Sequence, residues 1–135
     1  MSCFKHKVKA FSLPELLVVL VIIGILVLIA LPNLMPLISK AKATEAKQQL
    51  VFLHSLQQSF FYSCSKYSSS FEELGFEQQP LSTEGGNANY LIEIIEASEN
   101  TFRAQAKAVA DFDGDGNFNL WEINEKKELK EITKD

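Results

Sequence analysis

The sequence contains few of the residues that build disulfide bonds or transition-metal sites. It has two cysteines, Cys3 and Cys64, and two histidines, His6 and His54. If the first ten residues are removed, Cys64 is the only cysteine left, so an internal disulfide bond is excluded. A lone cysteine near a helix end most often serves as a small apolar core residue, and we expect Cys64 to be buried. An intermolecular disulfide bond or a modification site is the alternative. His54 has no second histidine nearby except His6 in the leader, so we predict no histidine metal site, and we expect His54 at the surface or at the rim of the core.

Recognisable catalytic patterns are also missing. The sequence shows no nucleophile–base pair, no glycine-rich phosphate loop and no Cys/His zinc spacing. Carboxylates are numerous, but none has a recognisable catalytic spacing. We therefore expect that the protein is not an enzyme.

Basic side chains are scarce outside the N-terminus. The chain has 13 Lys and Arg against 17 Asp and Glu, and three of the bases (Lys5, Lys7 and Lys9) lie in the first ten residues. Without them, ten basic side chains stand against seventeen acidic ones, a net charge of −7. Nucleic-acid binding needs clustered Lys and Arg that displace counterions from phosphates, so it is not indicated.

The longest apolar segment lies near the N-terminus. Leu16 to Leu31 contains no polar side chain, and the mostly apolar span from Phe11 to Ile38 has 28 residues. A helix of that length is roughly 42 Å long, enough to cross a hydrocarbon core of about 30 Å. The lysines before it and the acidic remainder after it predict a single-pass precursor with a cytoplasmic N-terminus. A simple signal anchor and a cleaved secretory signal are alternatives; the position of Ala10 before the apolar run disfavours the second.

Glu15 is unusual because it places a carboxylate at the mouth of this membrane helix. Such a charge is costly unless it is paired or functional. If the chain is cut between Ala10 and Phe11, a new ammonium group appears at Phe11. The ammonium of one subunit and the Glu15 carboxylate of its neighbour could then neutralise each other in a filament core and set the register between subunits.

The segment Lys9-Ala10-Phe11-Ser12-Leu13-Pro14-Glu15-Leu16-Leu17-Val18-Val19 resembles the class III signal of type IV pilins and type II secretion pseudopilins. The resemblance implies cleavage between Ala10 and Phe11 by a prepilin peptidase, N-methylation at Phe11, and Glu15 as the assembly carboxylate. It also implies self-polymerisation or co-polymerisation with minor pilins, and an inner-membrane assembly platform as partner. The chain departs from the family pattern at Ala10, where Gly is usual, and at Pro14, which is tolerated in a first helical turn.

The segment after the apolar run predicts a long helix on a small sheet. Gly24, Pro32 and Pro36 are expected to interrupt the helix, either as kinks or as a weak segment that can unwind during assembly, as the resemblance favours. Ser39 to Phe61 is amphipathic, with an apolar stripe at steps of three or four. We expect three domains: a cleaved basic leader (residues 1–10), a transmembrane and filament-core segment (11–38) and a soluble head (39–135).

The head is predicted to contain one short helix and three or four strands. Phe71 to Phe76 reads as a helical turn with Ser70 as N-cap and Gly75 as stop. Asn89–Ala97, Thr101–Ala110 and Asn117–Asn124 read as strands, and Glu128–Thr133 as a fourth strand or a tail. In Thr101–Ala110 alternate alanines form one face that a helix can approach closely. The fold class is therefore α+β: a long N-terminal helix packed on a small antiparallel sheet, which is also the pilin architecture.

An acidic loop carries a candidate calcium site. Residues 111–122 match the EF-hand pattern, with Asp111, Asp113, Asp115, Asn117 and Glu122 as candidate ligands and Gly116 at the sharp turn. The same Asp-Gly sequence between two strands is also favourable hairpin chemistry without a metal. Calcium is therefore one alternative and a metal-free hairpin the other.

Together these features predict a structural subunit of a type IV pilus-like filament, first in the bacterial inner membrane and then in a periplasmic or cell-surface filament. Two alternatives stay open. One is a major-type pseudopilin of a type II secretion system. The other is a membrane-anchored calcium-binding module that does not polymerise.

Overall fold

One long helix, α1, runs from Leu13 to Cys64 in the computed structural model, which describes residues 9–135. The chain divides into two units, one ending at Leu34 and the other spanning Met35–Asp135, and each is considered by itself. Most of the basic leader lies outside the described residues. The expected domain boundaries after residues 10 and 38 stay predictions.

In the first unit, α1 exposes its apolar side chains. Every side chain from Leu13 to Leu34 is exposed within this unit. Among the described residues, α1 is the one helix long and apolar enough to cross a membrane, judged by length and composition. Exposure of so much apolar surface in water is unfavourable, so this unit requires a lipid or protein environment.

The helix is continuous through Gly24, Pro32 and Pro36, which differs from the expected interruption. Each proline lacks one backbone N–H and so removes one hydrogen bond, while the bonds of the neighbouring residues can keep the helix in register. An apolar environment also favours helix, because an unwound backbone would leave polar groups unsatisfied there. Unwinding during assembly stays a prediction.

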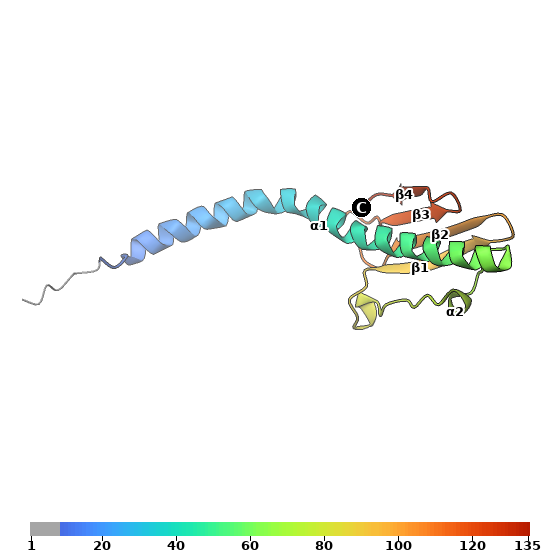
Figure 1. The fold of residues 1–135 in the computed structure, drawn as a ribbon. Helices are drawn as coiled ribbons and strands as arrows, with labels where there is room; N and C mark the ends of the chain where they lie inside the picture. Colours follow the sequence, from blue (N-terminus) through green and yellow to red (C-terminus); the bar gives the residue numbers. More distant parts are fainter. Residues whose placement is uncertain (1–8) are drawn as a thin grey trace, which may run out of the picture. The chain divides into compact units, whose positions relative to one another are not determined.

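The second unit contains a four-stranded antiparallel sheet with the strand order β1-β2-β3-β4. The strands are β1 (Tyr90–Ala97), β2 (Phe102–Ala108), β3 (Leu120–Asn124) and β4 (Leu129–Thr133). The C-terminal half of α1 lies across one face of this sheet (Figure 1). The prediction of an α+β fold is confirmed, and the segment from Glu128 to Thr133 contains a fourth strand and not a tail.

The core of this unit forms where small residues of α1 meet small residues of β2. Ala46 on α1 and Ala104 and Ala106 on β2 are fully buried, and Leu50 and Leu53 fill the space beside them. Because alanine has no side chain beyond Cβ, helix and sheet can approach closely. The expected row of alanines extends to Ala108, whereas Ala110 lies beyond β2 and is exposed.

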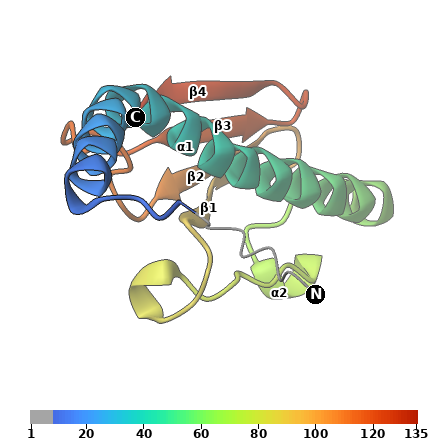
Figure 2. The same cartoon turned by 90° about the vertical axis from the view of Figure 1, so that its left-hand side faces the viewer.

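Short elements connect α1 to the sheet on the β1 side. Helix α2 (Phe71–Leu74) begins after Ser70, whose side chain accepts a hydrogen bond from the Glu73 amide, and it ends at Gly75 in the left-handed conformation (φ 69°). These are the predicted caps, and they are confirmed. A 3₁₀ helix, η1 (Ser82–Glu84), follows in the predicted loop. Figure 2 shows α2 beside β1, at the opposite edge of the sheet from β4.

Two expectations about single residues are wrong. His54 is buried, not at the surface, and its Nε2 lies 3.1 Å from the Glu125 carbonyl oxygen. Cys64, expected in the core, is exposed at the end of α1 with a free thiol. The helix extends past the edge of its packed region, so its last turn faces solvent although its sequence is not markedly polar.

Candidate functional site

The predicted cleavage position lies just before α1. Ala10 and Phe11 are outside the helix and exposed, with Phe11 77% exposed. A peptide bond outside a helix can be bound by a protease in extended form without unfolding helical structure. The structure therefore places the Ala10–Phe11 bond in an accessible segment.

Glu15 is hydrogen-bonded within its own chain. Its carboxylate accepts a hydrogen bond from the Ser12 amide (3.0 Å), while the Leu16 amide donates to the Ser12 carbonyl (3.2 Å). A glutamate three residues after a helix N-cap serine is half of a capping box. Pro14 lies in the same first turn, where its missing N–H costs no hydrogen bond.

Sequence reasoning missed this cap, although the spacing Ser12-x-x-Glu15 is its known signature. This cap gives the Glu15 side chain a hydrogen-bond partner within its own chain. Its carboxylate already has a donor near the apolar side chains of Phe11, Val18 and Val19, which line the same hollow. The negative charge is also favourable at the positive end of the helix dipole. The Glu15 side chain therefore already has a hydrogen-bond donor in a single subunit, before any neighbour supplies an ammonium group.

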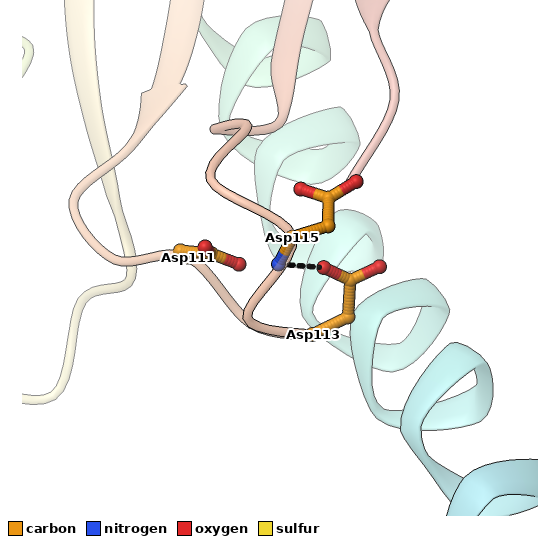
Figure 3. A group of neighbouring side chains, drawn as sticks. All are labelled: Asp111, Asp113 and Asp115. Carbon is orange, nitrogen blue, oxygen red and sulfur yellow. Dashed lines mark hydrogen bonds between the residues drawn. The ribbon is translucent and has the colours of Figure 1, made fainter.

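The acidic loop brings three of the five candidate calcium ligands together (Figure 3). One ligand oxygen from each of Asp111, Asp113 and Asp115 lies within 4.8 Å of the others. The loop amides fold inward toward these carboxylates: Gly114 and Gly116 donate to Asp111 at 2.6 and 2.7 Å, and Asp115 donates to Asp113 at 3.0 Å. Both glycines have positive φ (81° and 90°), a conformation that suits residues without a side chain.

The other two candidate ligands are not in this group. Glu122 lies in β3 and accepts a hydrogen bond from the Gln105 side chain of β2 (2.8 Å). Asn117 follows the turn and donates from its own amide and side chain to Asp115 (2.7 and 3.1 Å). An EF-hand closes its site with the last glutamate of the loop. Because the flanking elements are strands, Glu122 is held in the sheet and that closure does not form.

Asp135 joins the acidic loop from the C-terminal side. Its carboxylate accepts hydrogen bonds from the amides of Phe112 (2.9 Å) and Asp113 (3.1 Å). Sequence reasoning had no signal for this contact, since the two segments meet only in the folded unit. The loop is thus held by carboxylate–amide hydrogen bonds, and its three clustered aspartates still offer the hard oxygen ligands that calcium prefers.

The carboxylates of this loop differ in acidity. The hydrogen bond from the Gly116 amide, together with the one from Gly114, outweighs desolvation of the carboxylate and lowers the pKa of Asp111. The Asp115 amide acts in the same direction on Asp113, but desolvation and the nearby charges of Asp115, Asp135 and Asp111 together raise the pKa of Asp113. Mutual repulsion among these carboxylates is the physical reason that a cation would be attracted here.

Two comparisons with known proteins found similarities, and the first of them lies in the N-terminal segment. A family model described as "Prokaryotic N-terminal methylation motif" matches residues 5–31. The "Type IV major pilin protein PilA" of Myxococcus xanthus (strain DK1622) is 41% identical over 75 residues, which cover 56% of this chain. The match spans about a third (34%) of that relative's length. The chain thus has a methylation motif that runs directly into α1, α1 packs on an antiparallel sheet, and over 56% of its length the chain is similar to a type IV major pilin.

Proposed function

We propose that this chain is a structural subunit of a type IV pilus-like filament. The observation that supports this most is that the methylation motif continues without interruption into one 52-residue helix. Its first part exposes mostly apolar side chains, and its last part packs on the sheet. The likeness to a major pilin supports the same conclusion. One helix can then serve as membrane anchor in the precursor and as filament core after assembly.

The proposed sequence of events assigns a role to each N-terminal residue. The precursor inserts with its N-terminus in the cytoplasm and the head on the other side of the membrane. Prepilin peptidase cuts between Ala10 and Phe11, and Phe11 is N-methylated. In the free subunit Glu15 accepts the Ser12 amide. On assembly, Glu15 pairs with the Phe11 ammonium of a neighbour, which is favourable in a core of low dielectric constant.

The alternatives make different predictions. A secretion pseudopilin would share the processing and the Glu15 pair, and the match to a major pilin favours the pilus. A calcium-binding module that does not polymerise would rest on the acidic loop alone, in which Glu122 is turned away from the aspartate cluster. We propose a structural role without catalysis.

The test is a Glu15→Leu variant of the full chain in its native host. Mass spectrometry of the N-terminus should still find cleavage after Ala10 and a methylated Phe11. Electron microscopy and a sheared-filament fraction should show loss of filaments, because the leucine offers no charge for a neighbouring ammonium group.

The matched control is Glu99→Leu, which removes an exposed glutamate from the turn after β1 and should leave filaments unchanged. Normal filaments in the Glu15→Leu variant would refute the proposed role of Glu15. An uncut wild-type N-terminus, or a wild-type chain that never enters a filament, would refute the proposed function.

A further inference from the structure

The first strand of the sheet, β1, lies at an edge, because it pairs only with β2 in the order β1-β2-β3-β4. An edge strand presents backbone N–H and C=O groups that no neighbouring strand occupies, and an extended segment of another chain can pair with them. The Val109 amide donates to the Asn89 carbonyl, so Asn89 and every second residue after it face β2. The outward groups of β1 therefore belong to Tyr90, Ile92 and Ile94.

A loop segment runs along this edge of the sheet. It comprises residues Phe76–Ser82, leads from α2 to η1, and is called the covering segment below (Figure 1). Its Gln78 side chain takes the place of a strand backbone: Nε2 donates to the Tyr90 carbonyl (3.2 Å), and Oε1 accepts the Ile92 amide (3.0 Å). A side-chain amide offers both a donor and an acceptor, so one glutamine satisfies two backbone groups of the edge.

The covering segment is also attached near its C-terminal end. The Ala88 amide donates to the Pro80 carbonyl (3.0 Å), and the Ser82 amide donates to the Ala88 carbonyl (2.8 Å). The approach is close, since a Cβ added at Gly86 would overlap the Pro80 carbonyl. The segment is thus held against β1 at two places, through the Gln78 side chain and through the backbone around Pro80.

Gln78 interrupts the row of outward backbone groups on β1. The Tyr90 carbonyl and the Ile92 amide, which it occupies, are neighbours along the edge. Beyond them only the Ile92 carbonyl and the peptide groups of Ile94 continue the row, and no described residue outside the sheet bonds to these. That remainder is much shorter than an average strand of about 5–6 residues. Without Gln78, the whole row from Tyr90 to Ile94 would be open, which is close to that length.

A second copy of β1 matches the edge that Gln78 occupies. In a two-fold antiparallel pair centred on Ile92, Tyr90 of each copy faces Ile94 of the other. All outward groups then find partners. On the next positions Leu91 faces Glu93 of the other copy, so the register places no like charges directly opposite each other.

We propose that the Gln78 side chain blocks the addition of a second copy's β1 to this edge. The covering segment must be released before the edge can pair, so association between subunits is left to other surfaces. Subunits anchored side by side have a high local concentration, which would favour pairing of an open edge. The inference rests on the fold of the second unit and does not depend on the proposed filament.

A Gln78→Ala variant of the full chain in excess detergent tests this role. In a Cys3→Ser, Cys64→Ser, Ile95→Cys background, one nitroxide label replaces the exposed Ile95 side chain. In the proposed pair the two labelled positions lie about six residues apart along antiparallel strands, roughly 20 Å. Pulsed electron paramagnetic resonance should find this distance in the Gln78→Ala variant and not in the background alone.

Gln79→Ala is the matched control for this variant. Gln79 is the exposed neighbour of Gln78, and among the described residues its side chain forms no hydrogen bond. A second measurement uses a fluorescein-labelled peptide with the sequence of residues 88–98. It should bind the Gln78→Ala chain at least tenfold more tightly than the Gln79→Ala chain, because only the former has an open edge.

Hydrogen exchange of the amides in β2 and β3 verifies that each variant is folded. If Gln78→Ala loses this protection, Gln78→Met replaces it, since methionine keeps the side-chain length without the two hydrogen bonds. A folded variant that shows neither the distance nor the peptide binding would overturn the proposal. The same distance in the Gln79→Ala control would also overturn it, because β1 would then pair although Gln78 is present. Absence of wild-type filaments would refute the proposed function and leave this inference unaffected.

Discussion

Gln57 forms a double hydrogen bond in the buried part of the second unit. The side chain is fully buried, and its amide makes two hydrogen bonds to the backbone of Ser68: Nε2 donates to the carbonyl at 2.6 Å, and Oε1 accepts the N–H at 3.0 Å. Ser68 is itself 4% exposed, so its backbone groups have no ready access to water. Gln57 thus fastens the chain that leaves α1 back onto the helix.

Replacement of Gln57 by leucine keeps most of the side-chain volume and removes both hydrogen bonds. Two buried backbone groups then lose their partners, at about 1–3 kcal/mol each. The leucine recovers part of that loss through its apolar burial, so we expect the free energy of unfolding to fall by about 2–4 kcal/mol. The segment Ser65–Ser70 should loosen before the sheet does, because its attachment to α1 is what the substitution removes.

Urea unfolding of the full chain in detergent micelles, followed by Trp121 fluorescence, measures this change. Gln48→Leu is the matched control, since Gln48 lies on the same helix but is exposed and makes no side-chain hydrogen bond. It should change the free energy of unfolding by less than about 0.5 kcal/mol. A Gln57→Leu variant as stable as this control would refute the reasoning that the double hydrogen bond holds the connection in place.

Two further predictions concern the acidic loop and the helix–sheet contact. On acidification, NMR titration should show Asp113 protonating first, above its ordinary pKa of 3.8, and Asp111 last, below that value. Asp111 therefore stabilises the folded loop above pH 3.8, and this contribution is lost as the pH falls through its lowered pKa. Asp113 has the opposite effect, because its ionised form destabilises the folded loop above its raised pKa. If Asp111 titrated at a higher pH than Asp113, the hydrogen bonds assigned to the loop would be contradicted. Ala106→Leu should destabilise the second unit by about 1–3 kcal/mol, because the fully buried alanine has no space for a larger side chain between α1 and the sheet. Thermal unfolding measures this loss, and Ala41→Leu on the exposed face of α1 is the control that should remain within about 0.5 kcal/mol of wild type.

Local sequence signals predicted the helix ends and the strand faces of the head well where neighbouring residues alone determine them. Ser70 and Gly75 bound α2 as expected because capping needs only the residues next to the helix end. The alternation in Phe102–Ala108 identified the inner face of β2, since side chains of a strand point alternately to its two faces. The third strand starts at Leu120, three residues later than expected, because the residues before it belong to the loop that follows the acidic turn.

Contacts between distant segments were not predictable in the same way. The burial of His54 depends on the Glu125 carbonyl in the β3–β4 turn, and the double hydrogen bond of Gln57 depends on the path of the chain after α1. The position of Glu122 likewise depends on its strand: the EF-hand spacing is present in the sequence, but pairing of β3 with β2 directs this side chain to Gln105. A pattern of ligand types alone could not reveal that.

The sequence by itself determined the N-terminal features on which the proposed function rests: the lysines of the first ten residues, the predicted cleavage position between Ala10 and Phe11, Glu15, and an apolar helix long enough to span a membrane. These depend on composition and on spacing along one helix, so they need no knowledge of the rest of the fold. Only the tertiary structure decided which carboxylates of the acidic loop meet, that Asp135 joins them, and that Trp121 lines a cavity together with three lysines and four carboxylates. Those arrangements arise from residues far apart in the chain, and the order and register of the strands bring them together.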